Sequence, residues 1–328
     1  MRILLVKLSS LGDVIQTMPV VDDLRTHLGV VSVDWVVEEA FAGLVERVSG
    51  LERVIPIAQR RWRKSWLAAS TRRERKAFVH TLQSASYDAV IDFQGLVKSA
   101  LVARQAKLAA GGFRATYANA SEACGYEWPV RYLLDRPVAM ERRIHAVARY
   151  RLLAARAMGY DVSALADAPP RYGLRTTPVG ERKAVLLAHG TTRIDNEWPA
   201  QAWAELARRL AGQGQHVWLP HANEREEKWV QALACAIGSS ATVLPRMGLP
   251  QMMDVMAGSV GVIGVDSGLS HLAVALDLAH VQLFSQARAW RAGPVGRPHQ
   301  VAVGGERAPT VDEVWHAWRA VSAAVKSA

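Results

Sequence analysis

Cysteine is almost absent from this chain of 328 residues, which contains only Cys124 and Cys235, far apart and at no metal-binding spacing. This excludes a disulfide framework and a cysteine-based zinc site, and it is typical of a protein from a reducing compartment. No apolar run approaches the roughly 18 residues of a membrane span. The apolar segment after Met1 is too short for a signal peptide, so we expect a cytoplasmic protein.

The common nucleotide and metal motifs are missing as well. The sequence has no G-x-G-x-x-G, P-loop, H-E-x-x-H, paired C-x-x-C or D-x-D motif. Dinucleotide enzymes, P-loop nucleotidases and zinc enzymes therefore lose their usual sequence support. We expect neither a cofactor nor a metal ion.

Acidic residues are outnumbered, with 40 Lys and Arg against 30 Asp and Glu. Residues 1–173 hold 25 of the basic and 17 of the acidic residues, so most of the excess lies in the first half. Its densest part is interrupted by Trp62 and Trp66 and contains Arg60, Arg61, Arg63, Lys64, Arg72, Arg73, Arg75 and Lys76. Such a run is usually a solvated face. Cations mixed with indoles also suit an anionic membrane surface, a large anionic substrate or a nucleic acid.

Short apolar runs alternate with helical patterns, which is typical of parallel α/β units. In the first half we predict strands at 2–6, 33–37, 54–57 and 89–93 and helices at 13–27, 73–83, 96–108 and 142–158. After a linker rich in Pro and Gly (168–180), we predict strands at 183–189, 216–219, 242–244, 260–265 and 281–284 and helices at 199–210, 224–236, 249–257, 267–276 and 311–325. The pattern indicates two Rossmann-type domains, 1–173 and 174–328, with ligands at the carboxyl ends of the strands in one cleft.

Three polar loops follow predicted strands. In the first, Lys7–Asp13, Asp13 either caps the next helix or takes a proton from an acceptor hydroxyl. The second, Asp266–His271, opens a helix whose backbone N–H groups could bind an anion, or it holds only an N-cap and a core histidine. The third, His189–Pro199, is either a second ligand loop or a plain turn.

Several segments match motifs of a known family and occur in the same order along the chain. They are Lys7–Asp13 (K-x-S-S-x-G-D), Asp34–Glu39, Arg53–Pro56, Arg60–Lys64, Tyr87–Asp92, Gln94–Ala100 and Asp266–Leu272. Together they resemble the ADP-heptose:lipopolysaccharide heptosyltransferases over nearly the whole chain. The W-R-K and Q-G-L-V-K-S stretches favour type I over type II.

The resemblance implies a GT-B fold with an N-terminal acceptor domain and a C-terminal donor domain, and the last helix is a candidate to pack back on the N-terminal domain. It implies inverting transfer of L-glycero-D-manno-heptose from ADP-heptose to the Kdo of Kdo2-lipid A, in synthesis of the lipopolysaccharide inner core. We expect a monomer, held peripherally on the cytoplasmic face of the inner membrane, that binds no nucleic acid.

The resemblance also implies residue roles. Asp13 is the expected base. The expected donor ligands are Thr191, Thr192, Asn196, Glu226 (or its neighbour Glu224), Met247, Asp266, Ser267, Gly268 and His271. The expected acceptor ligands are Ser10, Gly12, Arg60, Arg61, Arg63, Lys64, Gln94 and Lys98.

Two departures from the family pattern affect the donor. In the family, one donor loop reads R-x-D-K-x-W-P, and this chain has Asn196 in place of its lysine. The family also has P-T-D-P after the last strand, where this chain has Ser285–Arg288. An amide supplies no charge to a diphosphate. Either Arg193 or another cation replaces the lysine, or the donor binds more weakly, or the donor differs. A transferase for another sugar nucleotide, an epimerase of the same fold and a nucleic-acid-binding protein remain as alternatives.

Overall fold

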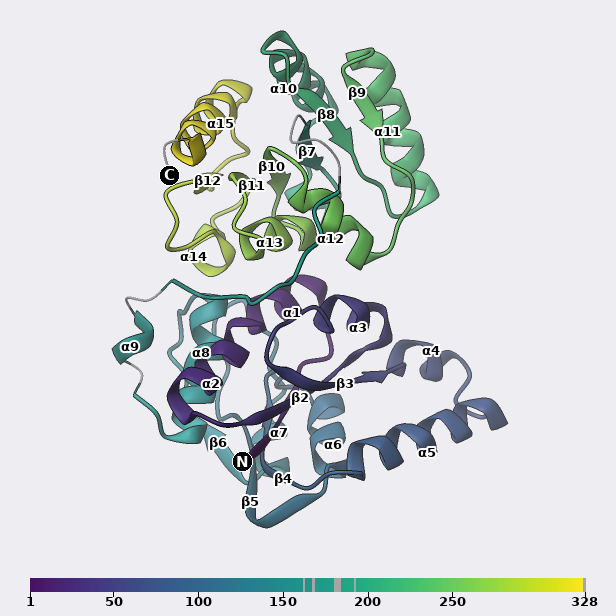
Figure 1. Cartoon of the computed structure of the whole chain (residues 1–328), viewed down its shortest axis with the longest axis vertical. Coiled ribbons are helices and arrows are strands. Elements are labelled where there is room, and N and C mark those ends of the chain that lie inside the picture. Colours follow the sequence, from purple (N-terminus) through teal and green to yellow (C-terminus); the bar gives the residue numbers. More distant parts are fainter. Residues whose placement is uncertain (162, 167–168, 180–183, 192, 327–328) are drawn as a thin grey trace. The chain divides into compact units, whose positions relative to one another are not determined.

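The computed structural model describes residues 1–161, 163–166, 169–179, 184–191 and 193–326 (Figure 1). The chain divides into two compact units, Met1–Arg175 and Thr176–Ala328. This division falls after Arg175, close to the boundary predicted after residue 173. No helix in these ranges is long and apolar enough to span a membrane.

The first unit is built on a parallel six-stranded sheet in the order β3-β2-β1-β4-β5-β6. Its strands are β1 (Arg2–Val6), β2 (Ser32–Glu38), β3 (Leu51–Ile57), β4 (Tyr87–Asp92), β5 (Leu108–Tyr117) and β6 (Arg136–Val138). The last four residues of β1 are fully buried, as expected for a strand covered on both faces. The sequence analysis missed β5 and β6, because β5 contains two glycines and β6 has only three residues.

Nine helices are present in the described part of this unit. They are α1 (Leu11–Thr17), α2 (Pro19–Leu28), α3 (Glu39–Val45), α4 (Gln59–Lys64), α5 (Ala69–Gln83), α6 (Val97–Gln105), α7 (Val130–Leu133), α8 (Ala146–Met158) and α9 (Ser163–Ala166). The helix predicted at 13–27 is two helices, because Pro19 has no N–H to continue the first and starts the second. The basic stretch at 60–64, which no predicted element covered, forms α4.

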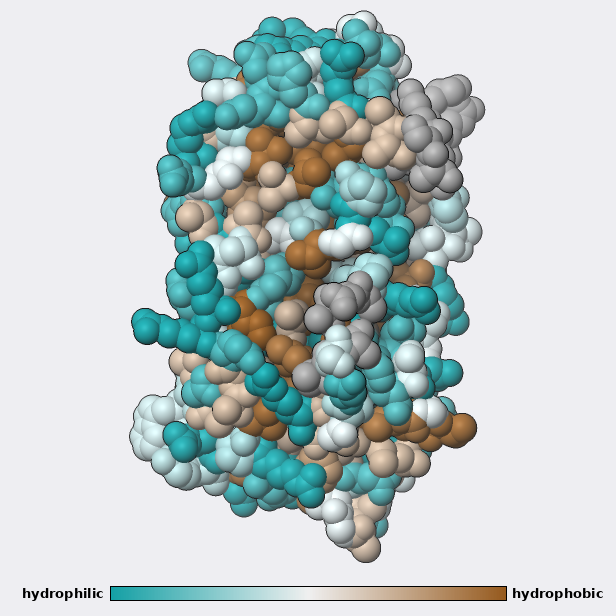
Figure 2. All heavy atoms as spheres, turned by 90° about the vertical axis from the view of Figure 1, so that its left-hand side faces the viewer, coloured by the Kyte–Doolittle hydropathy of each residue, from teal (hydrophilic) through white to brown (hydrophobic). Residues whose placement is uncertain are grey.

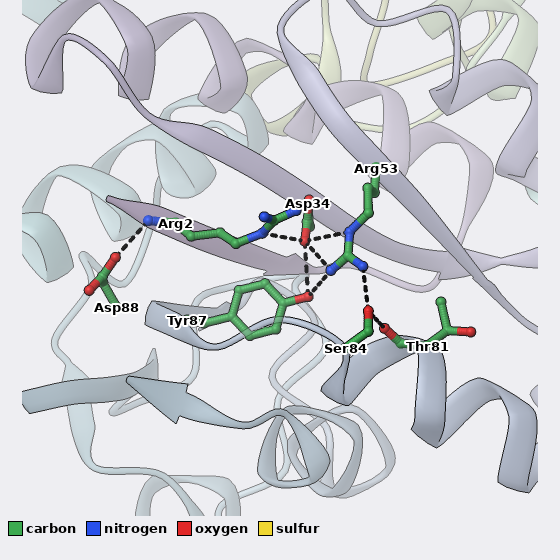
Figure 3. A network of polar contacts seen from close by, with 7 residues as sticks. All are labelled: Arg2, Asp34, Arg53, Thr81, Ser84, Tyr87 and Asp88. Atoms are coloured by element: carbon green, nitrogen blue, oxygen red, sulfur yellow. Dashed lines mark hydrogen bonds and ion pairs between the residues drawn. The ribbon is translucent and has the colours of Figure 1, made fainter. Parts of the chain in front are cut away.

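A buried ionic network joins the strands at the edge where they begin (Figure 3). Oδ2 of the buried Asp34 accepts hydrogen bonds from Arg2 Nε (3.0 Å), Arg53 Nη2 (2.7 Å) and the Tyr87 hydroxyl (3.0 Å). Burial alone would raise the pKa of Asp34, but the hydrogen bonds from Arg53, Arg2 and Tyr87 lower it below its ordinary value. Three of the family-like segments, which begin at Asp34, Arg53 and Tyr87, thus contribute to holding the sheet together.

The second unit has a parallel six-stranded sheet of its own, in the order β12-β11-β10-β7-β8-β9. Its strands are β7 (Ala184–Ala188), β8 (His216–Leu219), β9 (Ala241–Val243), β10 (Gly261–Val265), β11 (His280–Phe284) and β12 (Gln300–Gly304). Its helices are the 3₁₀ helix η1 (Ile194–Asn196) and α10 (Ala200–Gly212), α11 (Glu224–Ile237), α12 (Leu249–Ala257), α13 (Gly268–Ala275), α14 (Ala289–Ala292) and α15 (Val311–Lys326). Of these strands, β12 was not predicted.

The last helix, α15, packs within the second unit. Its buried residues Val314, Trp318 and Val321 belong to the apolar core that β7, β8, β10 and β11 share. Trp318 also donates its indole N–H to Gln215 at 3.0 Å. Its apolar face is therefore used against the sheet of its own unit, and packing of this helix on the N-terminal domain stays a prediction. On the face shown in Figure 2, hydrophobic residues form small groups among hydrophilic ones, as is ordinary for a protein surface.

Candidate active site

Three loops of the second unit meet at one edge of its sheet. Strands β11, β10 and β7 are neighbours and run parallel, so the loops that follow them leave from the same edge (Figure 1). Ligands of open α/β sheets bind at this carboxyl edge. Two of the loops are those singled out in the sequence, and the third is the altered Ser285–Arg288 segment.

The loop after β10 forms the start of α13. Ser267 has an extended backbone and caps the helix, since its hydroxyl accepts the Ser270 N–H. Asp266 is therefore not the N-cap, and its carboxylate lies 3.4 Å from Nε2 of His271, with both side chains about nine-tenths buried. Gly268 is the first helical residue, so the free N–H groups of the first turn are available to an anion.

Asp266 is surrounded by positive charge. Burial raises the pKa of its carboxyl, but the hydrogen bond from His271 and the charges of Arg291 and Arg288 together lower it below the ordinary value. Arg288 is half-buried, and within the described ranges its side chain makes no hydrogen bond or ion pair. Neither arginine was predicted as a site residue, although Arg288 lies in the segment that departs from the family's P-T-D-P.

In the loop after β7, the charged side chains pair with one another. Arg193 forms an ion pair with Asp195 (Nε–Oδ1 3.0 Å), and Gln286 donates to the same carboxylate at 2.8 Å. Arg193 is thus neutralised locally, which weakens it as the replacement for the family lysine. Asn196 is 2% exposed, and its amide nitrogen has no partner among the described residues. The Thr191 hydroxyl oxygen accepts a hydrogen bond from the Arg193 N–H at 3.2 Å. Thr192 lies outside the described residues.

A pocket of about 590 Å³ lies beside this loop. Its lining includes the predicted residues Thr191 and Glu226 and the aromatic side chains of Trp198, Trp203 and Trp229. Glu226 is fixed there because it accepts hydrogen bonds from the Ala222 N–H (2.8 Å) and the Asn223 side chain (2.8 Å). Glu224 and Met247 do not line this pocket.

In the first unit, the loop after β1 fixes Asp13. Its Oδ2 accepts hydrogen bonds from the Ser10 N–H (3.2 Å) and hydroxyl (2.9 Å), and its Oδ1 accepts one from the Tyr150 hydroxyl (2.9 Å). Ser10 and Asp13 form a capping box, so the helix-cap interpretation is correct as far as it goes. The half-buried carboxylate is also anchored from α8, which a simple cap does not need. Gly12, in the same first turn, is half-buried.

Gln94 supports this loop. Its side-chain oxygen accepts the backbone N–H groups of Leu8 (3.2 Å) and Ser9 (3.1 Å). The predicted acceptor ligand therefore has a clear structural role, since it holds the loop that carries Asp13. The sequence could not show this, because Gln94 and Ser9 are far apart in the chain.

The first unit has a groove of about 780 Å³, which lies between α4, α5 and α6. The predicted residues Arg63 and Lys98 line it, and its aromatic and aliphatic lining includes Trp62, Trp66 and Leu101. Further cations that the sequence analysis did not assign also line it, namely Arg72, Arg75 and Lys76. No acidic residue is among the groove's described lining residues.

The other cations of α4 are placed differently. Arg61 pairs with Glu39 (3.0 Å) and Glu74 (2.8 Å), and hydrogen bonds to these two carboxylates raise the pKa of its guanidinium. Arg60 and Lys64 are exposed, and like Arg61 they do not line the groove. The predicted acceptor set is therefore brought together only in part. Within the described ranges, no group of three or more His, Cys, Asp and Glu residues could hold a metal ion.

Comparison with known proteins gives a consistent result. A model of glycosyltransferase family 9 (heptosyltransferase) matches residues 75–314. Lipopolysaccharide heptosyltransferase 1 of Escherichia coli (strain K12) is 38% identical over 305 residues, which are 92% of this chain and 93% of that protein. The structure of E. coli heptosyltransferase WaaC with ADP aligns with a TM-score of 0.84 and 36% identity, covering 100% of this chain and 98% of that one.

The E. coli ADP-heptose lps heptosyltransferase II has the same fold, with a TM-score of 0.77, 20% identity and coverage of 99% of this chain and 100% of that one. The predicted GT-B fold is thus confirmed. The preference for type I over type II is confirmed as well.

Proposed function

The chain belongs to glycosyltransferase family 9 (heptosyltransferase), and we propose that it transfers L-glycero-D-manno-heptose from ADP-heptose to the Kdo of Kdo2-lipid A. The curated relatives, named lipopolysaccharide heptosyltransferase 1, support this assignment to inner-core lipopolysaccharide synthesis. The observation that carries it is the pair of sites in one chain: a carboxylate anchored by hydrogen bonds in the first unit, and a nucleotide-sized pocket beside a cation-rich helix start in the second.

The second unit is suited to an ADP-sugar. The nucleoside would occupy the 590 Å³ pocket, where Glu226 would accept a hydrogen bond from a ribose hydroxyl. The diphosphate would lie at the start of α13, where backbone N–H groups, Ser267 and His271 meet the charges of Arg288 and Arg291. This arrangement stabilises the negative charge that develops on a departing ADP.

Asp13 is the proposed base. The acceptor hydroxyl oxygen attacks the anomeric carbon of the heptose, and Asp13 accepts the proton that this oxygen loses. The bond from the anomeric carbon to the diphosphate oxygen breaks at the same time, and its electron pair leaves with ADP. A single displacement of this kind inverts the configuration at the anomeric carbon.

The groove of the first unit would receive the lipid A part of the acceptor. Its positive side chains are complementary to the negative phosphate groups of lipid A; they are Arg63, Arg72, Arg75 and Lys98. Its apolar side chains would contact the lipid; they are Trp62, Trp66 and Leu101. Exposed Trp66 and Leu67 would settle at headgroup level, so the protein would attach peripherally and salt would weaken the attachment.

A second candidate, a transferase for another sugar nucleotide, is favoured by one observation: Asn196 stands where the family has lysine. Purified protein should therefore be incubated with Kdo2-lipid A and, in parallel, ADP-heptose, ADP-glucose or a UDP-sugar. We expect mass spectrometry to detect a product larger by one heptose with ADP-heptose alone. Transfer from a different donor, with none from ADP-heptose, would establish the second candidate.

The nucleic-acid alternative is tested by titrating the protein with duplex and single-stranded DNA at two salt concentrations. We expect no binding that survives physiological salt, since the groove's cations are assigned to the acceptor.

A further inference from the structure

Lys7, directly after β1, carries its ammonium group into the interior of the first unit. The residue is 3% exposed. Its Nζ donates a hydrogen bond to the Phe93 backbone oxygen at 3.2 Å and another to the Tyr150 hydroxyl oxygen at 3.1 Å. The same nitrogen lies 4.7 Å from the centre of the Tyr150 ring. Burying a cation is costly unless it is paired, so a lysine here calls for an explanation.

Tyr150 connects this ammonium to Asp13. It lies on α8, is 2% exposed, and its hydroxyl donates to Asp13 Oδ1 at 2.9 Å. A phenol has only one proton to donate. Because Lys7 donates to the hydroxyl oxygen, the hydroxyl proton is directed to Asp13. Edge-to-face packing against Phe93, with ring centres 6.3 Å apart, keeps the ring in place.

The backbone around Lys7 is fixed too. The Trp35 indole N–H donates to the Lys7 carbonyl oxygen at 3.1 Å, and the Lys7 N–H donates to the Val36 carbonyl at 3.3 Å. Since Ser10 donates to Oδ2 of Asp13 and Tyr150 donates to Oδ1, both carboxylate oxygens have a donor. The plane of the carboxylate is therefore set by partners on two different elements.

We propose that Lys7 and Tyr150 are positioning residues for Asp13: Lys7 orients the Tyr150 hydroxyl, and the hydrogen bond from that hydroxyl fixes the orientation of the Asp13 carboxylate. A hydrogen bond donated to a carboxylate also favours its ionised form. This inference rests on the proposed function, in which Asp13 is the base. It assigns a role in catalysis to two buried residues, which act through Asp13. The lysine of the K-x-S-S-x-G-D segment is then more than a residue that ends a strand.

Other titratable groups lie near this chain of hydrogen bonds. Asp92, at the end of β4, is fully buried; burial raises its pKa to about 6, and the charge of Lys7 acts against that rise. On β5, Tyr117 is within electrostatic reach of Asp13 and Asp92, and the guanidinium of Arg149 on α8 lies 3.5 Å from the centre of its ring. Asp92 can therefore contribute to the acidic limb of a pH profile, so the test compares variants and does not rely on one profile.

Tyr150→Phe is the first variant, because it removes one hydroxyl and keeps the ring. Its matched control is Tyr117→Phe, at a buried tyrosine whose hydroxyl has no hydrogen-bond partner among the described residues. We expect Tyr150→Phe to lower kcat about 10-fold, to leave KM for ADP-heptose within about twofold, and to move the acidic limb of kcat/KM to higher pH. Tyr117→Phe should match the unmodified protein in all three.

Lys7→Met is the second variant, and Lys7→Arg tests whether a different cation restores part of the activity. Both should change kcat and the pH profile in the same direction as Tyr150→Phe, with Lys7→Met the more severe. Thermal unfolding and ADP binding by calorimetry check that each variant is folded. Should Lys7→Met fail to fold, Tyr150→Phe still decides the matter.

The outcomes separate the two levels of the argument. If Asp13→Ala abolishes turnover while Tyr150→Phe behaves as Tyr117→Phe does, the positioning role is refuted and the base assignment stands. If Asp13→Ala keeps normal turnover, the base assignment itself fails. A lower kcat in Tyr150→Phe with an unmoved pH profile would also overturn the inference, because a purely structural loss lowers kcat without moving the acidic limb.

Discussion

Replacing Arg288 and Arg291 by glutamine should weaken ADP binding much more than adenosine binding. Both arginines act electrostatically on Asp266, beside the start of α13, and neither lines the 590 Å³ pocket assigned to the nucleoside. Adenosine lacks the diphosphate, so it serves as the internal control. A loss confined to ADP affinity would show that Arg288 and Arg291 supply the positive charge that Asn196 does not.

The size of the effect follows from the kind of contact. A hydrogen bond to a charged group is worth about 1.5–3 kcal/mol, which corresponds to roughly 10- to 150-fold in affinity. Since both side chains are half-buried, we take the lower end and expect about 10-fold weaker ADP binding for each single variant. The salt dependence of ADP binding should become shallower in the same variants.

Isothermal titration calorimetry with ADP and adenosine, at low and at moderate ionic strength, measures this directly. Arg208→Gln, at an exposed arginine of α10 outside the pocket lining, is the matched control and should change neither affinity. Adding Asn196→Lys to the protein that carries both Arg288→Gln and Arg291→Gln should restore part of the ADP affinity. The new lysine returns a cation to the same edge of the sheet. Unchanged ADP affinity in the double variant, or equal losses for ADP and adenosine, would refute the reasoning.

Three further predictions concern the first unit. Asp13→Ala should reduce turnover about 10²–10⁴-fold with little change in ADP affinity; near-normal turnover would leave the residue as a helix cap only. Four of the groove's cations can be removed in one protein by Arg63→Gln, Arg72→Gln, Arg75→Gln and Lys98→Gln. This should raise KM for the acceptor and reduce binding to anionic vesicles without changing ADP affinity. A loss of ADP affinity would contradict the groove's assignment. Asp34→Ala should cost about 3 kcal/mol in urea unfolding, because it leaves two arginines without their buried partner. Since the folded-state pKa of Asp34 is lowered, its stabilisation should be complete above about pH 4 and be lost as the pH falls further; a pH-independent effect of the substitution would contradict this.

The central strands were predictable because their sequences alone report their burial. In β1, β7 and β10 nearly every residue is apolar or small, and a strand covered on both faces has that composition. The strands β5, β6 and β12 carry exposed residues or are very short, so no continuous apolar run identifies them. Register and sheet order come from long-range packing, which periodicity does not encode.

The candidate site divides along the same line. Asp13, Asp266 and His271 could be predicted because each lies in a short segment with a recognisable order of residue types. Tyr150 could not, because the residue that donates to Asp13 lies 137 positions away on a helix with an ordinary amphipathic pattern.

The two departures from the family pattern both bear on the charge of the proposed donor site. Asn196 removes a cation from the loop after β7, and Arg193, the nearest candidate in sequence, is committed to Asp195. Gln286 donates to that same carboxylate, so the altered segment after β11 is physically joined to the altered loop after β7. Arg288, two residues later, adds its charge to the surroundings of Asp266. In the proposed donor site, the positive charge for a diphosphate would therefore come from the segment after β11 and not from the loop after β7.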